Sequence, residues 1–476
     1  MSVTTTPAKD RVPFLEKAAF GSGHLVNNLL PGALGVFSFF LLTAFGMDPF
    51  LAGLLGGLPR LFDAITDPIM GYISDNTKSR FGRRRPYIFV GAILSGLLFM
   101  LLWQLDPDAS QMYNFWYFLI FSLIYLIGNT MFSTPLIGLG YEMTFDYNER
   151  TRLMGFSQVI GQIAWMIVPW FWVLIANPDL FETQAQGVHQ LAVIVGIACI
   201  VLGIMPALFC KEVDQTNLDK REKMTMASVL ENLKELIRNM KLIAQNKPFA
   251  RLCGSTFLVF NGFQMVASFS YFIIVFHMFN GDYGMAGTWP AWFSTVSALA
   301  TAFLIIPIIT MLANKYGKRN AFIISTIISI VGYLLKWWGF SPENPWLIFM
   351  PIPFMVFGIG GLFTLMMSMT ADVCDYDELQ HGMPRKEGSF GAIYWWMVKL
   401  GQGLALVLGG LVLKVVGFDP ALSEQTAQTM VNLRLADIII PSVTAALAVW
   451  VMWGYDLSEE RAREIKDQLV ARRGEL

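Results

Sequence analysis

Long apolar stretches alternate with short polar breaks along the whole chain. A helix needs about 20 apolar residues to cross the hydrocarbon core of a bilayer. The sequence predicts roughly twelve such spans, near residues 20–45, 49–74, 87–104, 113–141, 153–176, 189–210, 249–278, 288–313, 321–339, 346–371, 388–416 and 437–456. This pattern predicts an all-α protein that is integral to a membrane.

Composition agrees with that reading. Of 476 residues, 55% are hydrophobic and 14% are charged, and the mean hydropathy is +0.51, whereas an average soluble domain has about 25% charged residues. The net charge of -1 gives no reason to expect a nucleic-acid partner. The four cysteines are scattered without paired spacing, which predicts neither a disulfide framework nor a metal cluster. The expected partners are the lipid bilayer and a small-molecule substrate, and the expected assembly is a monomer.

Basic residues in the loops predict an orientation, because cytoplasmic loops retain Lys and Arg. Three loops on one side are basic, and they carry Lys78, Arg80, Arg83, Arg84, Arg85, Arg150, Arg152, Lys315, Lys318 and Arg319. The loops on the other side are bare, apart from Lys414 and Arg434 near the last one. We therefore expect a multi-pass protein of the plasma membrane, or of the inner membrane in a bacterium, with both termini in the cytoplasm.

One long hydrophilic stretch divides the chain into two halves. The predicted parts are a cytoplasmic tail (1–19), a six-helix bundle (20–210), a cytoplasmic linker (211–248), a second six-helix bundle (249–456) and a second cytoplasmic tail (457–476). Within the linker, Leu230, Leu233 and Ile237 have helical spacing, which predicts an amphipathic helix on the membrane surface.

The two halves share a sequence echo. Residues 79–84 read Ser-Arg-Phe-Gly-Arg-Arg, and residues 314–319 read Asn-Lys-Tyr-Gly-Lys-Arg. Each hexapeptide falls between the second and third span of its half. This register predicts a parallel internal repeat, as in transporters of the major facilitator type, with a solute cavity between the bundles near the midplane.

The second span contains the densest group of ionisable residues, namely Arg60, Asp63 and Asp67, with Thr66 beside them. A charge facing lipid costs about 2.5–3.5 kcal/mol on insertion scales, so such residues are candidates for function. Asp63 and Asp67 are four residues apart, so both carboxylates lie on one helical face. That pair suits sodium, which prefers oxygen ligands, and equally suits a proton. The structural alternative is an ion pair between Arg60 and Asp63, with Asp67 capping the helix end.

Two other spans carry residues that suit the same chemistry. Thr130, Ser133 and Thr134 form a hydroxyl face in the fourth span, which would either complete an oxygen-ligand site or bond one helix to another. Lys399 lies deep in the eleventh span, too far from either end for its ammonium to reach water. It therefore needs a carboxylate or a substrate oxygen.

Further polar and aromatic residues inside the spans are candidates for contact with the solute, although interhelical hydrogen bonds would explain the polar ones equally well. They are His24, Asn28, Ser133, Gln158, Gln162, Asn261, Gln264, Tyr394, Trp395, Trp396 and Gln402.

Four motifs give the chain a resemblance to the glycoside-pentoside-hexuronide:cation symporters, a branch of the major facilitator superfamily. They are Arg60-x-x-Asp63-Ala64-x-x-Asp67-Pro68 leading into Asp75-Asn76-Thr77 and Arg80-Phe81-Gly82; Glu142-x-x-x-Asp146-Tyr147-x-Glu149-Arg150; Asp372-x-x-Asp375-Tyr376; and Lys399 with Gly401. The resemblance extends over nearly the full chain.

This resemblance implies roles for the second-span group. Members of the family bind the coupling cation with two second-span aspartates and a fourth-span threonine, which here are Asp63, Asp67 and Thr130. Thr66 stands where a family member has asparagine. The eleventh-span lysine linked to coupling matches Lys399, and Arg60 is assigned to coupling with it.

The family's sugar-binding positions match less well. His24 and Ser133 fall where the family has aspartates, and Gln158 falls near the position of a fifth-span arginine. Galactoside recognition is therefore not expected. A glycoside or related sugar is the first expectation for the solute, and a lysolipid or other amphiphile is the alternative, because a related branch carries lysophospholipids.

The sequence thus predicts a symporter rather than an enzyme, with sodium or a proton as coupling ion and no cofactor. We see no paired metal-ligand histidines, nucleophile elbow or glycine-rich nucleotide loop. The cytoplasmic gate is expected to use ion pairs between basic loops and acidic helix ends, drawn from Arg83, Arg84, Glu142, Asp146, Arg150, Asp372 and Asp375.

Overall fold

A computed structural model describes residues 11–474, except 78, 145–146, 213–230, 232–233, 235–237, 239–244 and 382–386. Of the described residues, 83% are helical, and no strand occurs among them. Leu230, Leu233 and Ile237, the residues of the predicted amphipathic linker helix, lie outside the described residues.

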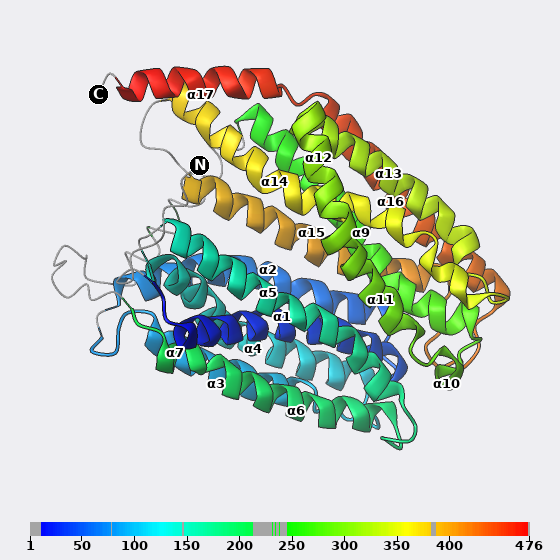
Figure 1. Cartoon of the computed structure of the whole chain (residues 1–476). Coiled ribbons are helices and arrows are strands. Elements are labelled where there is room, and N and C mark those ends of the chain that lie inside the picture. The colour runs from blue at the N-terminus through cyan, green and yellow to red at the C-terminus, as the bar shows by residue number, and fades with distance from the viewer. Residues whose placement is uncertain are drawn as a thin grey trace. The chain divides into compact units, whose positions relative to one another are not determined.

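The chain divides into two compact units. The first contains Met1–Asp48 and Leu61–Leu233, and the second contains Pro49–Arg60 and Lys234–Leu476. In the first unit, long helices run beside one another (Figure 1). Its elements are α1 (Phe14–Thr43), the part of α2 (Pro49–Asn76) from residue 61 onward, α3 (Arg85–Leu102), α4 (Gln111–Glu142), α5 (Tyr147–Ala176), α6 (Gln184–Gly203) and the short α7 (Met205–Phe209).

The second unit begins with the first turns of α2 and continues from the linker. Two of its spans contain short π-helical segments, labelled η2 and η3, and η4 is a 3-10 turn. Its other elements are α9 (Lys247–Phe272), η2 (Ile273–Met278), α10 (Tyr283–Ala286), α11 (Trp289–Leu299), η3 (Ala300–Ile305), α12 (Ile306–Tyr316), α13 (Lys318–Gly339), η4 (Pro345–Phe349), α14 (Ile352–His381), α15 (Glu387–Val415), α16 (Ala427–Trp453) and α17 (Glu459–Gly474).

Eleven helical stretches in the described part of the chain are long and apolar enough to cross a membrane. The remaining long helix is α2, which has 28 residues and carries Arg60, Asp63, Asp67 and Asp75. These charged side chains lower its hydropathy. With α2 included, the helices agree with the twelve expected spans. Helix α2 is not among the eleven apolar stretches because it contains the charged candidate cation ligands.

Helix ends differ from the expected ranges at both termini. Helix α1 begins at Phe14, so it includes residues that the sequence assigned to the tail 1–19. The acidic Glu16 lies in its first turn, where a negative charge is favourable because of the helix dipole. At the other end, α17 occupies most of the expected tail 457–476 and packs against α14.

The echoed hexapeptides share a backbone conformation. Gly82 has φ of 97° and Gly317 has φ of 80°, values that glycine adopts without the steric cost of a side chain. Helix α3 starts shortly after Gly82, and α13 starts directly after Gly317. Each echo therefore places a glycine with positive φ just before a spanning helix.

Small residues bring helix backbones close together within each unit, as is typical of membrane helices. In the first unit, a Cβ on Gly91 of α3 would lie 2.4 Å from the Phe132 nitrogen of α4. In the second, a Cβ on Gly57 of α2 would lie 2.6 Å from the Gly403 carbonyl oxygen of α15. These approaches leave no room for a larger side chain.

A buried ion pair joins two helices of the second unit. Lys336 of α13 pairs with Asp437 of α16, and their side chains are 0% and 1% exposed. Lys336 Nζ also lies 3.5 Å from the Ser270 hydroxyl of α9. Nearby, the Arg434 guanidinium of α16 lies 4.2 Å from the centre of the Trp337 ring and donates to the Trp337 carbonyl. This cluster connects α9, α13 and α16.

Replacing Asp437 with Asn should destabilise the protein strongly, because it leaves the Lys336 ammonium buried without its carboxylate. Breaking one side of a buried pair costs about 3–5 kcal/mol. The double replacement of Lys336→Met with Asp437→Leu should recover much of that loss, since no unpaired charge remains. Thermal unfolding of the purified protein, followed by tryptophan fluorescence, measures both. Equal stability of Asp437→Asn and the unmodified protein would contradict the prediction.

Candidate cation and solute sites

Helices α2 and α4 of the first unit bring three predicted cation ligands together. Asp63 is 5% exposed and Thr130 is 1% exposed. The Thr130 hydroxyl donates to Asp63 Oδ1 at 3.2 Å, and the Thr66 hydroxyl donates to the Asp63 backbone carbonyl at 3.2 Å. The hydroxyl oxygens of Thr66 and Thr130 are 3.3 Å apart. The structure therefore places oxygen atoms of all three residues in one small cluster.

The two hydroxyls of this cluster cannot donate in all three contacts at once, because each has one proton. Their oxygen lone pairs are ligands of the kind that small hard cations prefer.

A second pair of oxygen atoms lies one turn along the same helices. The Thr134 hydroxyl lies 3.5 Å from Asp67 Oδ1. Four residues separate Asp63 from Asp67 and Thr130 from Thr134, which corresponds to a rise of about 6 Å along each helix. The two carboxylates therefore face the hydroxyls of α4 at successive levels. Thr134 was part of the predicted hydroxyl face but not of the predicted cation ligands.

Three further residues were predicted to take part in the hydroxyl face or in coupling to the cation. Ser133 is half-buried on α4, beside Thr134 in the sequence. Arg60 belongs to the second unit, and its Cβ lies 3.3 Å from the position that a Cβ on Gly403 of α15 would occupy. Lys399 is half-buried on the same helix, α15. The coupling roles of Arg60 and Lys399 stay predictions.

Polar side chains of α1 and α5 meet in the first unit. Trp165 donates its indole N–H to Asn28 Oδ1 at 3.1 Å, and Asn28 Nδ2 donates to the His24 carbonyl at 2.9 Å. His24 packs edge-on against Phe20, and its Nε2 is buried with no hydrogen-bond partner among the residues that the structure describes. A Cβ on Gly161 would lie 2.8 Å from Asn28 Nδ2, so a larger residue there would displace the Asn28 amide. His24 and Asn28 were predicted from the sequence as solute contacts, whereas Trp165 was not.

The other solute candidates have different environments. Gln158 and Gln162 are exposed on α5. In the second unit, Asn261 is 5% exposed and donates to the Gly401 carbonyl at 3.2 Å, which is an interhelical bond between α9 and α15. Among the remaining candidates, Tyr394 is buried, Trp395 is exposed, and Gln264, Trp396 and Gln402 are half-buried. Trp395 is thus more accessible to a solute than Tyr394.

Charged residues at helix ends pair within each unit. The carboxylate of Glu212 accepts from the Arg84 backbone N–H at 3.2 Å and lies 3.6 Å from Arg83 Nε. Glu212 was not among the acidic partners expected for these arginines, because none of the sequence motifs includes the segment after the sixth span. In the second unit, Lys318 binds both carboxylate oxygens of Asp372, at 2.8 and 2.6 Å.

The other gate candidates are less informative. Asp375 is half-buried on α14. The side chains of Glu142 and Arg150, and all of Asp146, lie outside the described residues. The gate therefore stays a prediction.

Glu149, at the start of α5, connects this helix to the beginning of α1. Its carboxylate, 1% exposed, is 2.5 Å from Lys17 Nζ and 3.6 Å from Arg152, and it accepts the Val12 backbone N–H at 3.1 Å. Burial by itself would raise the pKa of Glu149. The hydrogen bonds from Lys17 and Val12, with the charges of Lys17 and Arg152, outweigh burial and lower the pKa below its ordinary value.

Known proteins resemble the chain over its whole length. Residues 19–459 match the family model described as MFS/sugar transport protein. The isoprimeverose transporter of Lactiplantibacillus pentosus is 23% identical, over 98% of this chain and 94% of that protein. The glucuronide carrier protein homolog of Escherichia coli (strain K12) is 23% identical, over 94% and 93%. The sodium-dependent lysophosphatidylcholine symporter 1 of Gallus gallus is also 23% identical, over 97% and 90%.

Solved structures agree on the fold. A bacterial homolog of the human lysosomal transporter spinster, in an inward-facing and unoccupied conformation, has a TM-score of 0.67 at 16% identity, covering 93% of this chain and 98% of that one. The helices and the acidic second span thus define a multi-pass membrane transporter of the major facilitator fold, not an enzyme. The chain belongs to the MFS/sugar transport protein family, as one of the glycoside-pentoside-hexuronide:cation symporters that its motifs indicated.

The stabilising effect of Glu149 should depend on pH in a defined direction. Because its pKa is lowered in the folded protein, its contribution is present above the ordinary glutamate pKa of about 4.3 and is lost as the pH falls below that value. Glu149→Gln should therefore cost about 2 kcal/mol at pH 7, the scale of a charged hydrogen bond. Thermal unfolding at pH 7 and pH 4 should show the gap to the unmodified protein narrowing in acid. Glu424→Gln, at an exposed position, is the control, and a gap of constant size would refute the assignment.

Proposed function

We propose that the protein is a secondary active transporter in which a cation, sodium or a proton, moves in symport with a small solute by alternating access. The observation that carries this proposal is the oxygen cluster of Asp63, Thr66 and Thr130. The relatives support symport, because they include a protein named as a sodium-dependent symporter.

The cluster suits a cation for two physical reasons. A carboxylate that is 5% exposed in a spanning helix needs a positive partner in some step of the cycle. Carboxylate, hydroxyl and backbone carbonyl oxygens, all of which this cluster offers, are the ligand types that small hard cations prefer.

Asp67 and Thr134 provide a second level of the same site. Two carboxylates one turn apart repel each other in a medium of low dielectric constant, so a positive charge that interacts with both is stabilised. We assign cation binding to Asp63, Asp67, Thr66 and Thr130, and coupling between cation and solute to Arg60 and Lys399. Coupling follows if the empty carrier and the doubly loaded carrier change face readily and the singly loaded forms do not.

For the solute, we propose a glycoside or related sugar. The isoprimeverose transporter and the glucuronide carrier homolog are relatives that support it. The hydrogen-bonded group of Asn28 and Trp165 supplies an amide and an indole ring, groups suited to hydroxyls and to the apolar face of a sugar. The second candidate is a lysolipid, favoured by the likeness to the lysophosphatidylcholine symporter.

We also propose that both termini lie in the cytoplasm and that the protein is a monomer in the plasma membrane. The basic loops before α3 and α13 support the orientation. Selective digestion or labelling of terminal tags in sealed vesicles tests it directly.

Replacing either aspartate should abolish coupled transport. In proteoliposomes with separately imposed sodium and pH gradients, Asp63→Asn and Asp67→Asn should lose at least about tenfold in gradient-driven uptake, because removal of a ligand charge weakens cation binding by more than about 1.4 kcal/mol. Solute exchange without a gradient reports whether the variants remain folded. Concentrative uptake at the normal rate by both variants would refute the cation site.

Thr130 allows a sharper test of the same site. Thr130→Ser keeps the hydroxyl and should retain cation dependence, whereas Thr130→Val keeps the shape and removes the oxygen. We expect Val to raise the cation concentration needed for half-maximal uptake by about tenfold, the value of roughly one hydrogen bond to a charged group. Ser and Val variants with the same cation dependence would show that Thr130 only packs against α2.

The solute class can be decided with one panel of labelled glycosides, uronates and lysolipids. Sugar transport should be competed by other glycosides and weakened about fivefold or more by Trp165→Phe, which removes the indole N–H that orders Asn28, a loss of about 1 kcal/mol. The exposed Trp450→Phe is the control. Uptake of lysolipid without any uptake of sugars would establish the second candidate instead.

A further inference from the structure

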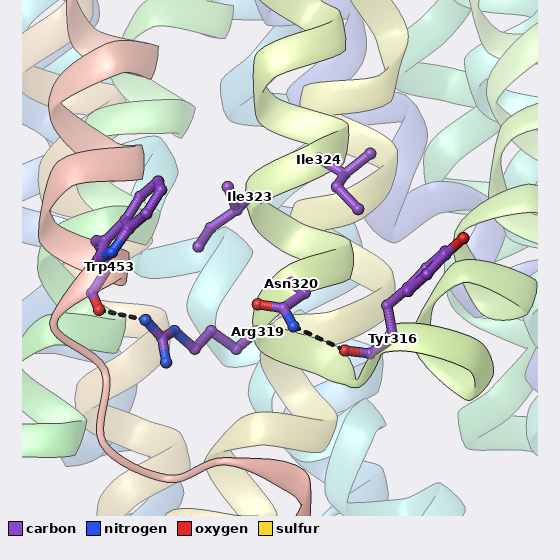
Figure 2. A pocket seen from close by; sticks show the side chains of 6 residues that line it. All are labelled: Tyr316, Arg319, Asn320, Ile323, Ile324 and Trp453. Atoms are coloured by element: carbon purple, nitrogen blue, oxygen red, sulfur yellow. Dashed lines mark hydrogen bonds between the residues drawn. The ribbon is translucent and has the colours of Figure 1, made fainter.

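A pocket of about 320 Å³ lies in the second unit, where α12 ends, α13 begins and α16 ends (Figure 2). Its lining combines a guanidinium, an amide, two aromatic rings and two aliphatic side chains, from Arg319, Asn320, Tyr316, Trp453, Ile323 and Ile324. Figure 2 shows the polar groups at the beginning of α13 and the isoleucines further along the same helix. The pocket is separate from the residues assigned to cation and solute.

Positive charge gathers at the polar end of this pocket. Helix α13 begins at Lys318, so the unpaired backbone N–H groups of its first turn point to this end and carry a partial positive charge. Two basic residues, Lys318 and Arg319, occupy the same turn, and no acidic residue does. Lys318 is neutralised by Asp372, at 2.6 Å.

Arg319 is not neutralised in that way. It donates from Nη2 to the Trp453 carbonyl at the end of α16, while its Nε is buried with no hydrogen-bond partner in the described part of the chain. A backbone carbonyl carries only a partial charge, so the guanidinium keeps most of its positive charge and has donors to spare. A bound anion would balance the positive charge of the guanidinium and accept hydrogen bonds from its remaining donors.

The corresponding turn of the first unit shows what is different here. After Gly82, the Arg83 guanidinium lies 3.6 Å from the carboxylate of Glu212, three residues beyond the end of α7, and Arg84 contacts it through its backbone N–H. The residue three positions beyond the end of α16 is Asp456, which pairs with Arg251 at 2.8 Å. The acid at the matching place of the second unit is therefore bound to an arginine of α9 rather than to the start of α13.

The surroundings of the pocket are apolar and exposed. Tyr316 and Trp453 are 47% and 65% exposed, and aromatic residues of this kind collect at membrane–water interfaces. Exposed apolar side chains continue from the pocket along the two helices: Ile327, Val331 and Leu334 on α13, and Val443, Leu447 and Trp450 on α16. In a spanning bundle such surfaces face lipid chains.

We propose that this pocket binds the headgroup of an anionic phospholipid. The phosphate accepts hydrogen bonds from Arg319 and from the first-turn N–H groups of α13, as anions do at helix N-termini. The Asn320 amide lies beside it, Tyr316 and Trp453 flank the glycerol region, and the acyl chains follow the apolar surface of α13 and α16. Basic pockets between spanning helices are typical binding sites for such headgroups.

Native mass spectrometry of the purified full-length protein in a non-ionic detergent tests the proposal. Phosphatidylglycerol should be retained at lower lipid concentration than phosphatidylcholine with the same acyl chains. Arg319→Gln should weaken the retention of phosphatidylglycerol by about fivefold, corresponding to roughly 1 kcal/mol for one basic residue at a membrane surface. Arg461→Gln, which removes an exposed charge from α17, should change it by less than about twofold.

A second variant keeps the test decisive if Arg319→Gln does not fold. Ile324→Trp leaves Arg319 and its bond to Trp453 in place and fills the pocket, so it should reduce phosphatidylglycerol retention to a similar degree. Equal retention of the two lipids by the unmodified protein would overturn the proposal, as would unchanged retention in both variants. Displacement of phosphatidylglycerol by inorganic phosphate at equal concentration would show a site for free phosphate and would also overturn it.

Discussion

A carboxylate inside a spanning helix must find partners in an environment that offers no water, and this constraint shapes both units. The Asp63 carboxylate accepts from the Thr130 hydroxyl of α4, while the Thr66 hydroxyl of its own helix donates to the Asp63 backbone carbonyl. The Asp437 carboxylate pairs with an ammonium from α13. The first arrangement offers oxygen atoms that suit the cation we propose, whereas the second is an ion pair within a cluster that connects three helices.

The difference between these two carboxylates separates transport from architecture. Hydroxyl groups are weak, reorientable partners, so the state of Asp63 can change when a cation arrives or leaves. A lysine held at 0% exposure is a strong partner with no second position available to it. In the cation site that we propose, a carboxylate of the first unit responds to the ion, whereas the carboxylate of Asp437 is held by a buried lysine.

Much of this could be predicted from the sequence, because lipid permits few arrangements of backbone and charge. Twelve spans, the acidic second span and its meeting with Thr130 followed from hydropathy, helical spacing and family motifs. Contacts between distant helices did not. The bond from Trp165 to Asn28 depends on how α1 packs on α5, and Glu212 lies in a segment without any motif. Both Lys336 and Asp437 fall inside predicted spans, so the sequence could have identified them as candidates for an ion pair. Each lies close to the end of its span, where a charged side chain can reach water and needs no partner.

The position of Lys336 and Asp437 in the chain also bears on how the protein is made. Helix α13 enters the membrane well before α16, the last spanning helix to be synthesised, so the lysine arrives without its partner. Until α16 follows, the ammonium must extend toward the nearby aqueous boundary or stay shielded by the insertion machinery. Without α16, Lys336 would lack its carboxylate, so the stability of the second unit depends on a helix that is made after α13.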